Sequence, residues 1–418
     1  MLIWSEPDSH GPPPVHSRTL KFLILYALAW GGGVIAYVPL LTLVLPVKIE
    51  ALAPGDKVAL LSLTTLLGAI VASVVNIAVG MASDRGVSGP RGRRPWVAAG
   101  LALTLGSYGL VHLSTTSVTI VLAVMAFQAA LNLMLAPLSA LVADEVPDHQ
   151  KGLIGGLMGA VYTFGALSGI VVTASPRLDE AAQLGIIGGL VTAAMMPFLL
   201  VSRRRGPIVP VPALTPAAGG LRRDALVRVW IARLLVQIAG SILFAYLLFF
   251  FQTVDRTGLL FGPPELSGQV AWLAGSVTVL LVPLAIAAGR LSDAVRSRKP
   301  FLVGSAAMIT SGLLVMALLP QWAPAAAGYV VFACGVAIFL ALQGAYAMQL
   351  LMSPRHRGRD MGILNLTNTL PALIAPSLAW LMADKGDFTA LLLLLAALAA
   401  LALILLIGIR DQPTPAAC

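Results

Sequence analysis

Charged residues and cysteine are both scarce in this chain of 418 residues. Asp, Glu, Lys and Arg make up 11% of it, whereas 58% is apolar and the mean hydropathy is +0.91. Soluble domains contain about a quarter charged residues, so this composition argues against a soluble protein and is typical of one that lies in a membrane. The only cysteines are Cys334, inside an apolar run, and Cys418 at the end, which makes a structural disulfide unexpected.

Acids at helix centres and metal-binding motifs are missing as well. All 18 Asp and Glu residues fall in tails, in loops or near the ends of apolar runs. No cluster of His, Cys and carboxylates has the spacing of metal ligands, so we expect neither a metal nor another cofactor. A membrane-embedded enzyme would need a nucleophile–base pair, a metal set or paired acids at depth. The sequence offers none of these, so we expect no enzyme.

Apolar runs long enough to cross a bilayer recur along the whole chain. A backbone in lipid must satisfy its own hydrogen bonds, so we expect these runs to form helices and the fold class to be an all-α polytopic membrane protein. The sequence predicts about twelve helices, at residues 20–45, 57–82, 95–113, 117–142, 152–174, 181–202, 225–252, 266–289, 300–319, 324–350, 358–383 and 387–409.

Two loops occur twice, about 207 residues apart. In both copies of the first loop, the preceding apolar run ends with Ser-Asp and a basic run follows. The matching acids of the two copies are Asp84 and Asp293. The second has Val146-Pro147 and Lys151-Gly152 in one copy, and Ser353-Pro354 and Arg357-Gly358 in the other. Such matching intervals predict two homologous halves of six helices each. We therefore divide the chain into a tail (1–19), a first bundle (20–202), a linker (203–224), a second bundle (225–410) and a tail (411–418).

The net charge of +9 follows from membrane topology. When the 27 Lys and Arg residues are assigned to alternate sides of the twelve helices, 21 fall on the side of both termini and five on the other, while Arg233 lies inside a helix. The positive-inside rule then places both termini in the cytoplasm, and we expect the membrane to be a bacterial inner membrane. No basic module interleaved with aromatic residues occurs, so nucleic acid is not an expected partner.

The first duplicated loop resembles the signature of the major facilitator superfamily, in which a Gly, three residues and Asp-Arg are followed by Gly-Arg-Arg or Gly-Arg-Lys. Gly80, Asp84-Arg85 and Gly92-Arg93-Arg94 match it, with a longer loop between the two parts. That loop, ending in Arg-Arg-Pro-Trp at 93–96, resembles the glycoside–pentoside–hexuronide cation symporters and the sucrose transporters. The resemblance implies a monomeric secondary transporter whose two bundles rock about a central site. Its implied substrate is a small molecule, a sugar or glycoside taken up with H+ or Na+.

These loop residues are placed to form a latch at the cytoplasmic side. Asp84 can cap the N-terminus of the helix that begins near Gly358, and Gly80, one turn earlier, allows close approach. Asp144 is placed to pair with Arg93 or Arg94. Leu351 takes the place of this acid in the second copy, so a second latch is less expected there, and the alternative is that the arginines only set topology. The candidate gate residues are Gly80, Asp84, Arg85, Gly92, Arg93, Arg94, Asp144, Gly289, Arg290 and Asp293.

Polar and aromatic residues inside the apolar runs are candidates for the central site, because polar groups in hydrocarbon are costly unless they are paired or line a wet cavity. Aromatic rings and amides suit a hydroxyl-rich ligand, whereas the alternative for any single amide is a helix–helix contact. By helical spacing the candidates are Tyr26, Trp30 and Tyr37; Gln128 and Asn132; Arg233 and Gln237; Gln343 and Tyr346; and Asn365 and Asn368.

Arg233 is the only cation well inside a predicted helix. It is placed either to bind an anionic substrate or a coupling carboxylate, or to snorkel to the cytoplasmic surface about one to two turns away, and we favour the second interpretation. For ion coupling, Glu50 and Asp255 occupy comparable places in the two halves, although both are more simply explained as interfacial charges. His112 is a weaker candidate.

Drug export is the main alternative within transport. Exporters of the superfamily often carry a Gly-Pro pair in their fifth helix. The run at 152–174 has several glycines but no such pair, which favours uptake. A sensor derived from a transporter usually carries an additional soluble domain, for which these tails are short.

Overall fold

The computed structural model describes residues 17–87, 89, 91–172, 178–202, 216–254, 266–351, 356–382 and 388–409. Asp255, Ser353-Pro354 and residues 203–215 of the expected linker lie outside these ranges. The elements in chain order are α1 (Leu20–Pro39), η1 (Leu40–Val44), α2 (Leu45–Leu52), α3 (Lys57–Asp84), α4 (Arg94–Leu113), α5 (Ser117–Glu145), η2 (Asp148–Gln150), α6 (Lys151–Val172), α7 (Glu180–Val201), α8 (Pro216–Thr253), α9 (Leu266–Val295), α10 (Lys299–Leu318), α11 (Trp322–Leu350), α12 (Arg357–Met382) and α13 (Thr389–Ile407).

The first membrane helix is longer than the sequence predicts, because α1, η1 and α2 follow one another without a break to Leu52. Pro46 has no N–H and would clash with the preceding turn of an ordinary α-helix. The chain widens to a π turn just before it, where the N–H of Leu45 bonds to the carbonyl of Leu40. The helix therefore passes the proline, and Lys48 and Glu50 lie on α2 and not in a loop.

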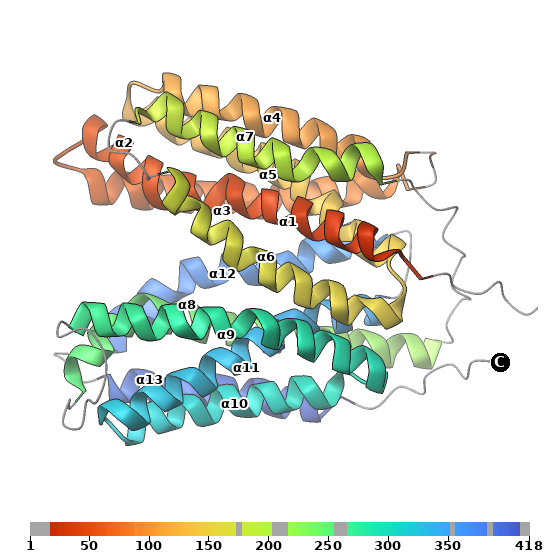
Figure 1. The fold of residues 1–418 in the computed structure, drawn as a ribbon, viewed down its shortest axis with the longest axis vertical. Coiled ribbons are helices and arrows are strands. Elements are labelled where there is room, and N and C mark those ends of the chain that lie inside the picture. Colours follow the sequence, from red (N-terminus) through yellow and green to blue (C-terminus); the bar gives the residue numbers. More distant parts are fainter. Residues whose placement is uncertain are drawn as a thin grey trace, which may run out of the picture.

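The helices form two bundles that correspond to the two halves of the sequence (Figure 1). Helices α1 to α7 form the first bundle and α8 to α13 the second, and the bundles meet mainly along α3 with α12 and along α6 with α9. Ten helices in the described residues are long and apolar enough to cross a membrane. The predicted all-α fold of about twelve long helices in two bundles is confirmed. Helix α8 begins at Pro216, inside the expected linker.

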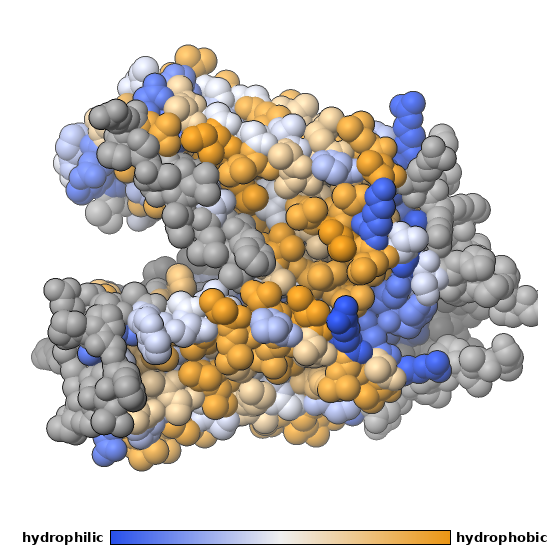
Figure 2. Space-filling model, viewed as in Figure 1, coloured by the Kyte–Doolittle hydropathy of each residue, from blue (hydrophilic) through white to orange (hydrophobic). Residues whose placement is uncertain are grey.

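Large apolar side chains cover the outside of the bundles between their two ends (Figure 2). Leu103 on α4 and Leu401 on α13 are examples, at 56% and 45% exposed. Inside each bundle, residues such as Phe127, Phe198 and Phe339 are fully buried. A surface this apolar is stable in lipid and not in water, so the chain is an integral membrane protein.

A cleft separates the bundles at one end of the molecule only (Figure 2). We call the end where α1 begins and α13 ends the terminal end, and the opposite end the open end (Figure 1). At the terminal end the bundles are in contact through α3, α6, α9 and α12. The molecule is therefore closed on one side and hollowed on the other.

Candidate functional site: two latches and a central cleft

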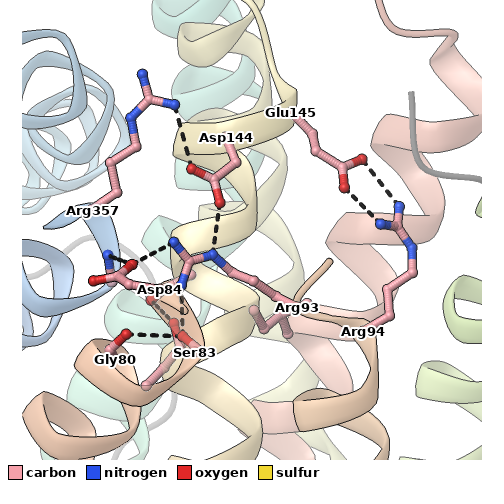
Figure 3. Close-up of polar contacts among 12 residues, drawn as sticks. Gly80, Ser83, Asp84, Arg93, Arg94, Asp144, Glu145 and Arg357 are labelled. Carbon is pink, nitrogen blue, oxygen red and sulfur yellow. Dashed lines mark hydrogen bonds and ion pairs between the residues drawn. The ribbon is translucent and has the colours of Figure 1, made fainter. Parts of the chain in front are cut away.

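The first latch joins the last turn of α3 to the first turn of α12 at the terminal end. One oxygen of the Asp84 carboxylate accepts the backbone N–H of Gly358 at 2.7 Å, and the other accepts that of Arg359 at 3.2 Å. These N–H groups have no partner within their own helix, and they carry the positive end of the helix dipole. An acid of the first bundle thus caps a helix of the second (Figure 3).

Arg93 holds the first latch together from within the first bundle. It donates to Asp84 at 2.7 Å, to Asp144 at 2.7 Å and to the hydroxyl of Ser83 at 2.6 Å, and its side chain is 1% exposed. The second oxygen of Asp144 accepts from Arg357 across the bundle interface at 3.3 Å. Of the two arginines expected to pair with Asp144, Arg93 does so (Figure 3).

Arg94 makes a separate contact beside the latch. Its guanidinium binds both oxygens of Glu145, at 2.6 and 3.0 Å, and it also donates to the carbonyl of Ser202. Glu145 in turn pairs with Arg18, which precedes α1. This second ion-pair cluster holds the start of α4 to the ends of α5 and α7 within the first bundle. Arg94 therefore stabilises the helices that carry the latch and makes none of the bonds that cross the interface in the described residues.

Glycines bring the two helices of the first latch into backbone contact. A Cβ on Gly80 would overlap with the carbonyl oxygen of Gly358, and a Cβ on Gly358 would overlap with that of Gly80. Any side chain at either position would push α3 away from α12 and lengthen the hydrogen bonds of Asp84. Both glycines are therefore required by the close approach of the helices.

Polar contacts continue along the same face of α3 toward the middle of the molecule. Asn76 accepts from Asn365 of α12 at 3.3 Å and donates to Asn132 of α5 at 2.8 Å. One turn farther, Ser73 and Thr369 share a hydrogen bond of 2.9 Å. Sequence reasoning overlooked Ser73, Asn76 and Thr369. Their signal is spacing, since residues 73, 76, 80 and 84 lie on one stripe of α3 and are all small or polar.

The second latch joins α9 to α6 and repeats the geometry of the first. Asp293 accepts the backbone N–H groups of Gly152 at 3.0 Å and Leu153 at 2.8 Å, and Arg298 donates to it at 2.6 Å. A Cβ on Gly289 would overlap with the carbonyl oxygen of Gly152.

The expectation of a weaker second latch is not supported by this geometry. Leu351, which replaces the second acid, is buried, and Arg298 bonds instead to the backbone carbonyl of Asp148. Arg298 therefore has a second acceptor, but this acceptor is a backbone carbonyl of the first bundle, across the interface.

Arg85, Gly92 and Arg290 are the remaining candidate gate residues. The side chains of Arg85 and Arg290 are exposed. Gly92 adopts a left-handed backbone conformation, with φ of 57°, and so makes the turn that delivers Arg93 to Asp84.

Tyr26, a candidate for the central site, is inside the first bundle and does not line the cleft. It is fully buried, its ring packs edge-on against Phe198 of α7, and its hydroxyl donates to the carbonyl of Leu138 on α5 at 2.9 Å. The bundle closes around α1 at this depth, so the expected role of Tyr26 in binding substrate is wrong. Trp30 and Tyr37, nearer the open end on the same helix, are only partly buried.

The amides of α5 contribute to contacts between helices. Asn132 is 8% exposed, and besides its bond to Asn76 it donates to the backbone carbonyl of Gln128 at 2.9 Å. Its polar groups are thereby satisfied within the protein, as the alternative of a helix–helix contact implies. Gln128 is partly exposed, and so is Tyr346 of α11.

The remaining candidates form one cluster in the second bundle. Arg233 of α8 donates to Gln343 of α11 at 2.8 Å and to Asn368 of α12 at 2.9 Å, and Gln237 donates to the same oxygen of Asn368 at 3.0 Å. The guanidinium therefore points toward α11 and α12, inside the second bundle. The snorkelling interpretation is not supported, because the terminal nitrogens bond to Gln343 and Asn368 inside the protein and the Nε is buried.

The ion-coupling candidates lie away from this cluster. Glu50 is 60% exposed and pairs with Lys57 near the open end, as an interfacial charge would. His112 lies 3.7 Å from Glu180, which also binds Lys48. Asp255 is outside the described residues. Within the described residues, no group of three or more His, Cys, Asp or Glu side chains is arranged to hold a metal ion.

The fold is that of a polytopic membrane protein with two helical bundles, which are in contact at one end and separated by a cleft at the other. The sequence matches the model of the Major Facilitator Superfamily over residues 59–351 and 265–417, and the chain belongs to this superfamily. No curated protein matches the sequence.

Solved structures of several transporters share the fold. A bacterial homologue of the iron transporter ferroportin in an outward-facing state is 18% identical, with a TM-score of 0.69, covering 94% of this chain and 99% of the other. The human organic anion transporter MFSD10 is 15% identical, with a TM-score of 0.68, and the match covers 94% of this chain and 100% of the other. The Escherichia coli fucose:proton symporter FucP is 12% identical, with a TM-score of 0.69, 95% of this chain and 100% of the other.

Proposed function

We propose that this transporter carries a small hydroxyl-bearing solute, a sugar or glycoside, through the central cleft by alternating access. The observation that carries the proposal is the pair of closed latches at one end combined with the open cleft at the other (Figure 2). A solute that enters such a cleft can leave on the opposite side only after the latches release and the open end closes.

The terminal end is the cytoplasmic end in this proposal. The side of the termini carries 21 of the 27 Lys and Arg residues, and such an excess is retained in the cytoplasm. The described conformation is then outward-facing, and uptake begins with a solute that enters from outside a bacterial inner membrane.

The fold alone does not identify the substrate, because the similar structures are named as a homologue of an iron transporter, an organic anion transporter and a fucose:proton symporter. The proposed substrate class therefore rests on the side chains of the candidate site. Partly buried rings, those of Trp30, Tyr37 and Tyr346, can stack on the apolar face of a sugar, and Gln128 and Asn368 can bond its hydroxyls. Coupling to H+ or Na+ is carried over from the resemblance of the loop ending at 93–96 to cation symporters.

A ligand panel tests this function. Purified protein in detergent is heated with neutral mono- and disaccharides, sugar acids and amphipathic drugs, since a ligand at a hundred times its Kd stabilises the folded state by about 2.7 kcal/mol. We expect stabilisation by sugars, lost in Trp30→Ala and retained in Leu103→Ala, which alters the outer surface of α4. Uptake into proteoliposomes with and without a proton or sodium gradient then tests coupling. Stabilisation by drugs alone would replace the proposal with export.

A further inference from the structure

The cluster around Arg233 contains two buried hydrogen-bond donors that lack an acceptor. The two terminal nitrogens of the guanidinium donate to Gln343 and Asn368, but its Nε has no partner in the described residues. The Nε2 of Gln343, whose side chain is fully buried, has none either. Buried polar groups in native proteins are nearly always bonded, so the unpaired Nε indicates that an acceptor is missing at the Nε and Nη2 edge of Arg233. The Nε atoms of Arg298 and Arg357 are also unpaired in the described residues, but both of these guanidiniums already bind a carboxylate.

Arg233 is also unlike the other buried arginines. Arg93, Arg94 and Arg298 each contact a carboxylate at 2.6 to 2.7 Å. In the described part of the chain, the hydrogen bonds of Arg233 go to neutral amides. A full positive charge at the middle of a membrane helix is costly without a negative partner, so the cluster requires both acceptor oxygens and a negative charge.

The cluster is accessible from the interface between the bundles. Asn365 bonds across this interface to Asn76, and Asn368, three residues farther along α12, lies on the same helical face and is exposed. Its amide oxygen accepts from both Arg233 and Gln237. An exposed neutral oxygen that accepts from a guanidinium and an amide occupies the position that an anionic oxygen would take.

We propose that the cluster binds the carboxylate of the transported solute, so that the substrate is an organic anion. One carboxylate oxygen displaces the Asn368 oxygen and accepts from Nη2 of Arg233 and from Gln237, and the other accepts from the unpaired Nε. The Nε and Nη2 edge of a guanidinium is suited to such bidentate binding. This inference rests on the proposed function and narrows its substrate from sugars in general to sugar acids.

Matched pairs of ligands test the inference. We measure the Kd of the wild-type protein for glucose and glucuronate, and for galactose and galacturonate, at constant ionic strength. We expect the acid of each pair to bind about 10- to 100-fold more tightly, the size of effect that hydrogen bonds to a charged group produce. In Arg233→Gln this preference disappears, whereas Arg228→Gln, on the same helix and paired with Asp224, retains it.

A second variant separates binding from a structural role. Asn368→Ala removes the oxygen that competes with the carboxylate, so acid binding is retained or strengthened, while a purely structural contact would leave the preference weaker. If Arg233→Gln does not fold, Arg233→Lys keeps the charge without the bidentate edge and should lose most of the preference. The wild-type comparison needs no variant at all.

The outcomes distinguish this inference from the proposed function. Equal affinity for acids and neutral sugars overturns the inference and leaves sugar transport in place. Binding of non-sugar carboxylates such as lactate or citrate, with no binding of any sugar, supports the anion site and overturns the sugar assignment. Tighter binding of inorganic phosphate or glucose phosphate than of any carboxylate, or no binding of carboxylates, overturns the inference.

Discussion

Replacing Asp84 with Asn should shift the conformational equilibrium of the transporter toward the state in which the terminal end is open. The Asp84 carboxylate makes three hydrogen bonds, of which only those to Gly358 and Arg359 cross the bundle interface. The bond to Arg93 lies within the first bundle and is available in both states. The two cross-bundle bonds alone therefore set how strongly this acid favours the closed terminal end.

The magnitude follows from the geometry of these two bonds. A hydrogen bond to a charged group contributes about 1.5–3 kcal/mol, and the 3.2 Å bond to Arg359 belongs at the lower end. Asn keeps one acceptor oxygen without its charge and points an amide donor at the other N–H. We expect a loss of about 2–3 kcal/mol from the closed state, or about 30- to 150-fold in the ratio of the two states.

Distances between spin labels at the open end measure this shift. Labels are attached through Leu113→Cys in the first bundle and Leu319→Cys in the second, both exposed, with the two native cysteines replaced by Ser. Asp84→Asn should move the distance distribution from long to short as the open end closes, and should slow transport.

Asp224→Asn is the control for this experiment, because its carboxylate is 57% exposed and pairs with Arg228 on its own helix. A distribution in Asp84→Asn that matches the wild type, together with a normal transport rate, would refute the latch.

Three further predictions concern the other contacts. Asp293→Asn should shift the same label distances by a similar amount, because Asp293 makes the same number of cross-bundle bonds as Asp84. A much smaller shift than in Asp84→Asn would mean that the second latch contributes less to the closed state than its hydrogen bonds indicate. Gly80→Ala should destabilise the closed terminal end through overlap with α12, while Gly106→Ala, with open space around it, leaves the distances unchanged. Glu50→Gln should leave the ion dependence of uptake unaltered, as measured in proteoliposomes, because its carboxylate is exposed; loss of that dependence would return Glu50 to the coupling site.

The repeat made the latch predictable from the sequence. Asp84 ends a helix, Gly80 lies one turn earlier, and the same pattern recurs at Gly289 and Asp293. Once both loops are assigned to the same side of the membrane, the acid that ends a helix in one half lies near the N-terminus of a helix in the other half. Capping that N-terminus is then the expected role of the acid. Sequence spacing could not decide whether Arg93 or Arg94 pairs with Asp144. The left-handed turn at Gly92 decides it in favour of Arg93, and spacing alone does not predict this turn.

The central site was less predictable because apolar side chains face both lipid and protein. The hydrophobic stripe that distinguishes the faces of a soluble helix is weak here, so helical spacing placed Tyr26 and Trp30 together although Tyr26 is enclosed by the bundle. The favoured interpretation of Arg233, snorkelling to the cytoplasmic surface, relied on its distance from the predicted end of the helix. Sequence spacing gave its distance from the helix end, but not the partners on α11 and α12 that hold its guanidinium inside the bundle.

Each latch combines a strong contact with an easy release, and the division of its bonds explains how. When the bundles separate at the terminal end, Asp84 keeps Arg93 and Asp293 keeps Arg298, so neither carboxylate is left as an unpaired charge. Breaking a buried ion pair would cost about 3–5 kcal/mol for each latch, enough to trap the transporter in one state. The bonds that Asp84 and Asp293 lose go to backbone N–H groups at helix ends, and water can replace them once the cleft opens there. In each latch the capping carboxylate and its buried arginine lie in one bundle and face main-chain donors of the other. The ion pair of Arg357 with Asp144 and the bond of Arg298 to the carbonyl of Asp148 also cross the interface. Because Asp144 keeps Arg93 and Arg298 keeps Asp293 when the bundles separate, these contacts too can break without leaving Asp144 or Arg298 as an unpaired charge.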